Sequence, residues 1–198
     1  MSLSVDYFRG IKFLVTDTVY FEPNPVTGLL DDNVEALRGL DSPTLVDVGS
    51  GVGNIAIFLA KELPTAKIIA IEPHDQSFDL LNQNIKMHGL GSRVKAIHSA
   101  VDKVELPVNS VDAVFGNIPN WPSWVNDPEL RFAKFAGIDG LDVVKDTIRF
   151  SDRVLRSGGF MHVTRYALPE DQPETWFNQN NWRDITTPHG FYLKAYKL

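Results

Sequence analysis

The sequence contains no cysteine among its 198 residues. It therefore has neither a disulfide framework nor a thiolate metal site, and this fits a reducing compartment. Long apolar runs are missing too: residues 1–9 lack the apolar core of a signal peptide, and no stretch reaches the length of a membrane span. We expect a cytoplasmic protein with no membrane contact and no metal site.

The chain also has few positively charged residues. The chain has 19 Lys and Arg against 25 Asp and Glu, which gives a formal net charge of −6. Proteins that bind bare nucleic acid usually carry a basic stripe that releases counterions from the phosphates. No dense Lys/Arg cluster occurs here, so the composition argues against a nucleic-acid partner and favours a small-molecule or protein substrate.

The apolar content supports one globular domain. Hydrophobic residues make up 43% of the chain, which is enough for a sizeable core, and the length is that of one domain. We predict a single domain over residues 1–198. Its first part, residues 1–40, should hold a small hairpin over residues 11–22 and a helix that Thr27 caps and that ends near Gly39.

Short apolar strands then alternate with helical segments. Alternation of this kind is typical of βαβ units and a parallel sheet with helices on both faces. We therefore predict an α/β fold: a doubly wound, mostly parallel, seven-stranded sheet that ends in an antiparallel hairpin. The strands are expected at residues 44–48, 67–71, 94–98, 111–115, 160–164, 182–186 and 191–196, and the helices at 53–63, 75–88 and 141–155.

A glycine-rich turn follows the first strand of this alternation and opens a helix. Such a turn lets the backbone approach a ligand and points helix N–H groups at it. The ligand should bind outside the carboxyl ends of the strands. The dinucleotide fingerprint would need a glycine at Asn54, so an NAD-dependent dehydrogenase is disfavoured. The segment comprises Asp47, Val48, Gly49, Ser50, Gly51, Val52, Gly53 and Asn54.

Glu72 ends the second strand, 19 residues after Gly53. A carboxylate at this place can accept hydrogen bonds from both hydroxyls of a ribose. A helix cap or an exposed surface residue is the plain structural alternative. With the glycine turn upstream, we assign Glu72 to ribose binding.

The G-x-G-x-G spacing after an acidic strand residue resembles motif I of the class I S-adenosyl-L-methionine (SAM)-dependent methyltransferases, which have a Rossmann-like fold. The resemblance implies that SAM is the cofactor, that Asp47 lies near its methionine ammonium, and that residues 1–40 pack on the cofactor side. An acidic residue that bonds the adenine often stands at the position of Ala100. Here backbone atoms or Asp102 would take that part. The implied cofactor contacts are Asp47, Gly49, Ser50, Gly51, Gly53, Asn54, Glu72, Pro73, Ala100, Val101 and Asn117.

The loop Asn117-Ile118-Pro119-Asn120 follows the fourth strand. It resembles motif IV, N-P-P-Y, of N-methyltransferases that act on glutamine amides or exocyclic base amines. SAM already carries a strong electrophile, so the enzyme chiefly has to hold a planar nitrogen in line with the methyl group. The resemblance implies that the Asn117 side-chain oxygen and the Ile118 carbonyl accept the two N–H groups, while Pro119 stiffens the loop. A turn without chemistry is the alternative.

The order of the motifs resembles the release-factor glutamine methyltransferase family over about residues 17–165. Residues 22–28, 127–132 and 138–142 match in sequence order. The chain departs from the family in two ways. Trp121 or Trp124 would have to replace the aromatic residue of motif IV, and too few residues precede the sheet for an N-terminal helical domain. Both departures argue against release-factor methylation and leave SAM binding intact.

Two function classes therefore compete. The leading hypothesis is SAM-dependent N-methylation of a planar amide or amine on a small molecule or protein. Its catalytic loop is Asn117, Ile118, Pro119 and Asn120. Methylation of a nucleic-acid base is the nearest alternative among enzymes. The changed residues Ile118 and Asn120 keep open the other class, a non-catalytic SAM-binding module.

Overall fold

The computed structural model describes most of the chain: residues 2–21, 27–121, 136–138, 140–165, 173–178, 180–186 and 192–198. Its residue contacts cluster into two compact units, Met1–Ala100 and Val101–Leu198. The assignment of residues 1–198 to a single domain stays a prediction. Among the described helices, none is long and apolar enough to cross a membrane.

The chain begins with an antiparallel hairpin of β1 (Leu3–Phe8) and β2 (Ile11–Thr16). Its two-residue turn is Arg9-Gly10, and both residues have positive φ, 50° and 77°, as the right-handed twist of a tight hairpin favours. The predicted hairpin over residues 11–22 was therefore wrong: residues 11–16 form only its second strand, and the first strand lies before them. Only Phe8 of β1 is buried. Leu3, Val5 and Tyr7 alternate with polar residues along the strand, but all three are exposed.

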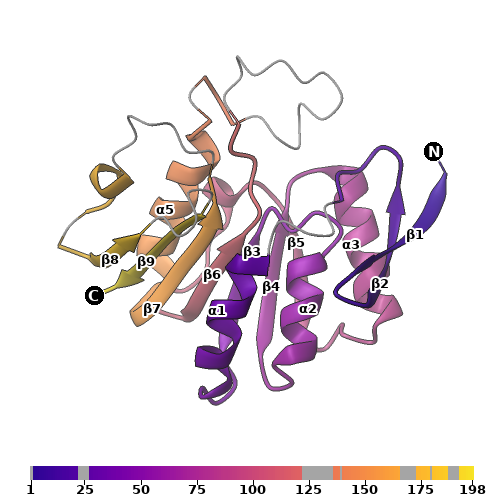
Figure 1. Cartoon of the computed structure of the whole chain (residues 1–198), viewed down its shortest axis with the longest axis horizontal. Coiled ribbons are helices and arrows are strands. Elements are labelled where there is room, and N and C mark those ends of the chain that lie inside the picture. Colours follow the sequence, from indigo (N-terminus) through magenta and orange to yellow (C-terminus); the bar gives the residue numbers. More distant parts are fainter. Residues whose placement is uncertain are drawn as a thin grey trace. The chain divides into compact units, whose positions relative to one another are not determined.

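The first unit also holds the helices α1 (Thr27–Arg38), α2 (Asn54–Glu62) and α3 (Asp75–Met87). Residues 55–60 of α2 are all buried, as expected for a helix enclosed by its neighbours. The helix α3 ends before Gly89, whose φ of 64° stops the helical path. In Figure 1 the hairpin lies beside α3, with which β2 is in contact. The helical spans agree with the predicted ones to within one or two residues.

Three parallel strands complete this unit: β3 (Thr44–Val48), β4 (Lys67–Glu72) and β5 (Val94–His98). Nearly every residue of β3 and β4 is buried. Strands that are covered on both faces read as continuous apolar runs, and this explains why these strands were visible in the sequence.

The second unit contains β6 (Val111–Gly116), β7 (Leu155–Thr164), β8 (Trp182–Thr186), β9 (Tyr192–Lys197) and the helix α5 (Asp142–Val154). Its described residues also include the short 3₁₀ turns η1 (Val101–Lys103) and η3 (Pro173–Trp176). The strand β6 pairs with β7 in parallel, and β9 pairs antiparallel with both β7 and β8.

The helix α5 is tied to the terminal hairpin through Asp152. Its Oδ1 accepts hydrogen bonds from the Trp182 indole at 2.9 Å and from Lys197 Nζ at 2.6 Å, and Asn181 donates to both carboxylate oxygens at 3.2 Å. These contacts fix the last two strands against the helix.

The strands of the main sheet run in the order β5-β4-β3-β6-β7-β9-β8. Five of them are parallel and the last two form the antiparallel hairpin. This confirms the predicted Rossmann-like α/β sheet of seven strands.

Candidate functional site

The glycine turn between β3 and α2 has backbone angles that favour glycine at three positions. Gly49, Gly51 and Gly53 have φ of 66°, 55° and 97°, values that residues other than glycine rarely adopt. A Cβ on Gly53 would lie 2.7 Å from Leu81 Cδ1, whereas a Cβ on Gly51 would meet nothing within 4 Å. The turn is therefore packed against the protein at Gly53 and open at Gly51, where a ligand could approach the backbone.

Backbone and side-chain bonds hold this turn in place without a ligand. The Ser50 N–H donates to the Ile71 carbonyl at 3.0 Å, and the Ser50 hydroxyl donates to the Asp47 carbonyl at 2.8 Å. The Gly53 N–H closes the turn onto the Ser50 carbonyl at 2.8 Å. The protein itself thus fixes the conformation of the turn.

Asp47 lies at the end of β3 and is fully buried. Its Oδ2 accepts the N–H of Ala56 at 3.1 Å, so Asp47 caps α2 in place of Gly53, the N-cap residue, which has no side chain to do so. Its Oδ1 is buried and has no hydrogen-bond partner among the described residues. Such an oxygen is costly unless a ligand donor completes it. Burial raises the pKa of Asp47 to about 7, against the opposing effect of hydrogen bonds from Ser50 and Ala56.

Glu72 is 6% exposed, so it is not a surface residue. Its two carboxylate oxygens accept the backbone N–H groups of Gly51 at 2.7 Å and His74 at 2.8 Å. Burial raises its pKa, and these two hydrogen bonds oppose the shift. A carboxylate offers about four lone-pair positions, so acceptor capacity remains for the hydroxyls of a ribose. Glu72 is not the cap of α3 either, because the side chain of His74 accepts the Ser77 N–H.

The other predicted cofactor residues are distributed as follows. Pro73 is exposed next to Glu72, Asn54 is the first residue of α2, Ala100 is half-buried at the end of the first unit, and Val101 is buried in η1. Asp102 is exposed.

His98, to which we assign no chemistry, packs at the end of β5. Its ring stacks on Phe78, with centroids 4.6 Å apart, and its Nε2 lies 3.2 Å from the Pro73 carbonyl oxygen. The described residues contain no group of three or more His, Asp and Glu side chains that could hold a metal ion.

The loop after β6 is tied together by its own side chains. Asn120 Nδ2 donates to the Ile118 carbonyl at 2.8 Å and to Thr164 Oγ1 at 2.9 Å, and Thr164 Oγ1 donates to the same carbonyl at 3.3 Å. Thr164 ends β7, which pairs in parallel with β6. The sequence gives no sign of Thr164, because the contact joins residues 44 positions apart.

This network bears directly on the predicted reaction residues. Both acceptor positions of the Ile118 carbonyl are engaged, so a substrate N–H reaches that oxygen only when Asn120 or Thr164 gives way. The half-buried side chain of Asn117 makes no hydrogen bond to any residue that the structure describes. Among the predicted loop side chains, Asn117 is therefore the polar group left open for a ligand.

Trp121 follows the loop and is half-buried, and its carbonyl accepts the N–H of Ala136 at 3.0 Å. Trp124, the other predicted stacking residue, lies outside the described residues. So do residues 22–26 and 127–132, on which part of the family resemblance depends.

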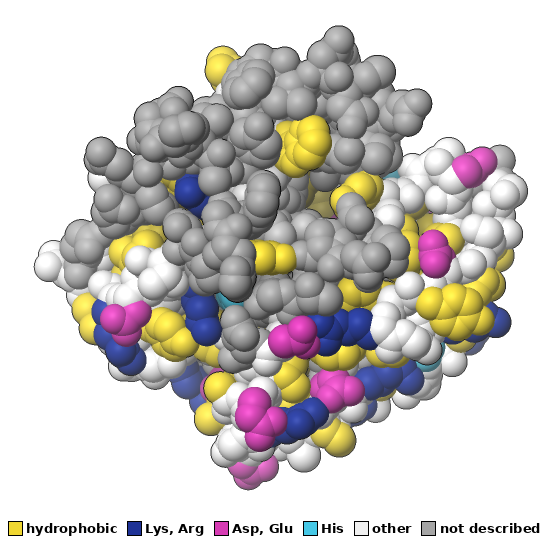
Figure 2. Space-filling model, viewed as in Figure 1, with side chains coloured by type: hydrophobic (Ala, Val, Ile, Leu, Met, Phe, Trp, Pro, Cys, Tyr) yellow, Lys and Arg dark blue, Asp and Glu magenta, His cyan; other side chains and the backbone are white. Residues whose placement is uncertain are grey.

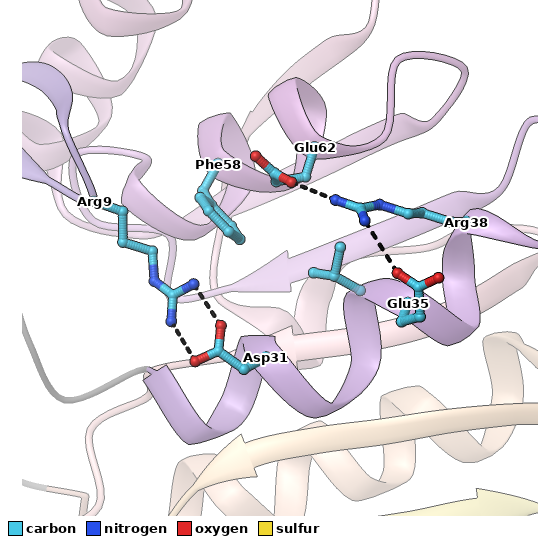
Figure 3. Close-up of a pocket in the computed structure, with 7 residues that line it drawn as sticks. Arg9, Asp31, Glu35, Arg38, Phe58 and Glu62 are labelled. Carbon is cyan, nitrogen blue, oxygen red and sulfur yellow. Dashed lines mark hydrogen bonds and ion pairs between the residues drawn. The ribbon is translucent and has the colours of Figure 1, made fainter.

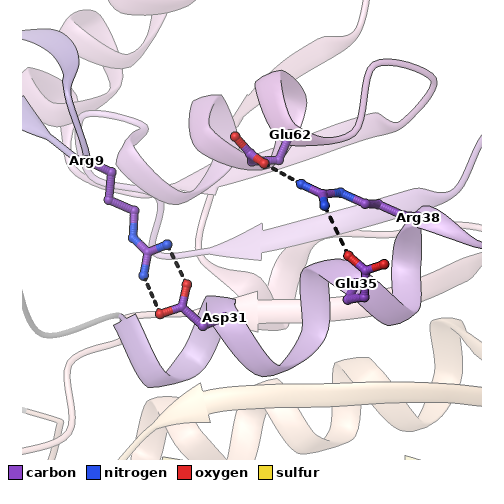
Figure 4. A network of polar contacts seen from close by, with 5 residues as sticks. All are labelled: Arg9, Asp31, Glu35, Arg38 and Glu62. Atoms are coloured by element: carbon purple, nitrogen blue, oxygen red, sulfur yellow. Dashed lines mark hydrogen bonds and ion pairs between the residues drawn. The ribbon is translucent and has the colours of Figure 1, made fainter.

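A separate pocket of about 320 Å³ lies within the first unit, between the hairpin turn, α1 and α2 (Figure 3). Arg9 pairs with both carboxylate oxygens of Asp31 at 2.6 and 2.8 Å, and Arg38 bridges Glu35 at 3.0 Å and Glu62 at 2.6 Å (Figure 4). Both guanidinium groups are thus neutralised within the protein. We interpret the pocket as a structural contact; its lining is Arg9, Asp31, Val34, Glu35, Arg38, Phe58 and Glu62.

Figure 2 shows Lys and Arg side chains interspersed with Asp and Glu side chains on the visible face. Among the described residues drawn there, no broad patch of positive charge gathers. This agrees with the low basic content of the sequence.

Comparisons with known proteins point to one class of enzyme. A family model described as a methyltransferase domain matches residues 45–138, which include the glycine turn, Glu72 and the Asn117 loop. The chain is 30% identical over 167 residues to a release factor glutamine methyltransferase of Gloeobacter violaceus, covering 80% of this chain and 58% of that protein. It is 29% identical over 192 residues to a ribosomal protein uL3 glutamine methyltransferase of Francisella tularensis, covering 87% and 60%.

The chain thus spans 58% and 60% of the lengths of these two relatives. Among solved structures, the tRNA m1G37 methyltransferase of M. jannaschii superimposes with a TM-score of 0.61 at 22% identity, covering 98% of this chain and 56% of that one. At this identity the likeness shows the fold alone. The fold is that of the Rossmann-like methyltransferases.

Proposed function

We propose that this chain, which carries a class I SAM-dependent methyltransferase domain resembling that of the release factor glutamine methyltransferases, N-methylates a planar amide. The observation that carries the proposal is the open side chain of Asn117 on a loop that Asn120 and Thr164 hold rigid. A fixed loop with one free acceptor suits a reaction that depends on orienting a nitrogen.

The residues of the first unit fit the cofactor. The unsatisfied Oδ1 of Asp47 is a buried acceptor suited to the methionine ammonium of SAM, and the open space at Gly51 admits the amino-acid part. Glu72 has acceptor capacity left for the ribose hydroxyls. When bound, SAM supplies an activated methyl group on its sulfonium.

The part of Asn117 is to position the acceptor. Its Oδ1 accepts an N–H of the substrate and so fixes the plane and direction of the nitrogen. Pro119 limits the movement of the loop, and Asn120 anchors the Ile118 carbonyl. No protein nucleophile is required, so the contribution of the loop is geometric.

The names of the relatives favour a glutamine side-chain amide in a protein as the acceptor. The chain covers under two thirds of those relatives, so the acceptor and the partner protein belong to this proposal, as does a cytoplasmic location. The formal net charge of −6 favours such a substrate over a nucleic-acid base.

The test is transfer of a radiolabelled methyl group from SAM. The acceptors are glutamine-containing peptides, free glutamine and duplex DNA, each with the wild type and with Asn117→Ala. We expect labelling of a glutamine peptide, a loss of turnover on the order of 10²-fold in the variant, and unchanged SAM affinity. Preferred labelling of DNA, or wild-type turnover in Asn117→Ala, would contradict the proposal. SAM binding without any transfer would favour the non-catalytic module.

A further inference from the structure

A buried asparagine joins the N-terminal hairpin to the glycine turn. Asn84 lies in α3 and is fully buried. Its Oδ1 accepts the N–H of Leu14 at 2.8 Å, and its Nδ2 donates to the carbonyls of Leu14 at 3.1 Å and Val52 at 3.0 Å. One side-chain amide thus contacts two segments that lie far apart in the sequence.

On the hairpin side, Asn84 takes the place of a neighbouring strand. It binds both the N–H and the C=O of Leu14, which lies opposite Val5 of β1 in the register of the hairpin. These two hydrogen bonds satisfy the backbone N–H and C=O of Leu14, which would otherwise carry a desolvation cost. The orientation of this side chain therefore contributes directly to the docking of β2 on α3.

On the turn side, Asn84 fixes one peptide plane. The Val52 carbonyl belongs to the peptide group that precedes Gly53, the residue with the most positive φ in the turn, 97°. A hydrogen bond to that carbonyl restrains rotation of the peptide between Val52 and Gly53. It thereby restrains the backbone that faces the cofactor.

We infer that Asn84 is a positioning residue that couples the docking of the hairpin to the SAM-binding conformation of the glycine turn. The inference uses the assignment of SAM to this turn and is independent of the acceptor. Because coupling between two sites is reciprocal, SAM binding stabilises the contact at Leu14, and loss of the contact weakens SAM.

Two other anchors hold the hairpin without touching the glycine turn. His88, one helical turn after Asn84, has its Nε2 2.8 Å from the Lys12 carbonyl oxygen. At the hairpin turn, Arg9 pairs with Asp31 and its guanidinium carbon lies 4.8 Å from the centroid of the Phe58 ring (Figures 3 and 4). Variants at His88 and Arg9 therefore separate loosening of the hairpin from a direct effect on the turn.

The experiment compares Asn84→Ala with His88→Ala and Arg9→Ala. SAM affinity is measured by calorimetry and stability by thermal unfolding. We expect Asn84→Ala to weaken SAM on the order of tenfold, within the usual range of coupling between sites. The two control variants should lower the unfolding temperature and keep SAM affinity within about twofold. Wild-type affinity in Asn84→Ala, or an equal loss in all three variants, would overturn the inference.

A second measurement needs no variant. Residue-resolved hydrogen exchange on the wild-type protein, with and without SAM, reports on the Leu14 amide that Asn84 binds. We expect slower exchange at Leu14 when SAM is bound. Unchanged exchange at Leu14, with SAM bound, would overturn the coupling even if Asn84→Ala does not fold. Failure of the wild type to bind SAM would instead refute the cofactor assignment.

Discussion

The N–H of Gly51 donates to Oε2 of Glu72 at 2.7 Å. The carboxylate that we assign to a ribose therefore also supports the turn that we assign to the rest of the cofactor. The other oxygen of Glu72 holds the His74 N–H at 2.8 Å. One buried side chain thus links the end of β4, the glycine turn and the start of α3.

This double attachment predicts a large effect of Glu72→Ala on SAM binding. The variant loses the proposed ribose contacts and leaves the Gly51 N–H without its acceptor, so we expect SAM to weaken by roughly 1.5–3 kcal/mol or more. Glu72→Gln should also weaken SAM, because its amide N–H₂ would face one of two backbone donors. Calorimetry on both variants checks this, with exposed Glu105→Gln as control. Unchanged affinity in a folded Glu72→Ala variant would contradict the assignment.

The same substitution, glycine to alanine, should affect stability at Gly53 and SAM affinity at Gly51. In Gly53→Ala the new Cβ would lie 2.7 Å from Leu81 Cδ1, and the alanine would have to adopt a φ of 97°. We therefore expect a loss of stability on the order of 2–3 kcal/mol. In Gly51→Ala the Cβ meets no protein atom, and the strain is about 1–2 kcal/mol. We expect Gly51→Ala to lose SAM affinity out of proportion to stability. Thermal unfolding measures the stability of the two variants, and calorimetry measures their SAM affinity. Equal losses of stability and equal losses of SAM affinity in the two variants would contradict the prediction.

The buried carboxylate of Asp47 predicts a pH-dependent SAM affinity. Burial raises its pKa to about 7, so below this pH the side chain is protonated in the free protein and must lose its proton to pair with an ammonium. The affinity should rise with pH by up to tenfold per unit and level off above about pH 7, and binding at pH 6 should release a proton.

Calorimetry in buffers of different ionisation enthalpy measures that release directly. Burial raises the pKa of Glu72 as well, so the variant Asp47→Asn is the control, since it keeps Glu72 intact. The variant should lose most of the pH dependence. A wild-type slope that survives in Asp47→Asn would assign the proton to another group.

The hydrogen bonds among Asn120, Thr164 and the Ile118 carbonyl predict that variants of Thr164 change turnover and leave SAM affinity unchanged. Thr164→Val removes the hydroxyl from both contacts and leaves Asn120 held by the Ile118 carbonyl alone, so turnover should fall by about tenfold or more. Thr164→Ser keeps the hydroxyl and should keep the rate. SAM affinity should stay the same in both. A drop of equal size in Thr164→Ser would point to packing of the threonine methyl group instead.

Asn120→Tyr tests the same network from the other side. It frees one acceptor position on the Ile118 carbonyl and adds an aromatic surface. We expect a gain of transfer to glutamine peptides, because the freed position on the carbonyl can accept a second N–H of the amide. Lower transfer to every acceptor would mean that Asn120 is needed to hold the loop.

The helices and the parallel strands could be predicted because their signals are local. Buried strands such as β3 and β4 show as apolar runs, and Gly89 ends α3 where a positive φ is required. The hairpin was misplaced because β1 was not assigned, although Leu3, Val5 and Tyr7 alternate with Ser4 and Asp6 in its sequence. In the structure this apolar face of β1 is exposed, and only Phe8 is buried.

The sequence by itself determined the alternating α/β fold, the glycine turn and the position of the loop at Asn117, since each depends on neighbouring residues. The tertiary structure alone decided which polar groups complete these segments. Asn84 meets Leu14 across 70 positions and Asn120 meets Thr164 across 44. Nothing in the local pattern marks such partners, because a hydrogen bond between distant segments forms only after the sheet and helices bring buried donors and acceptors together.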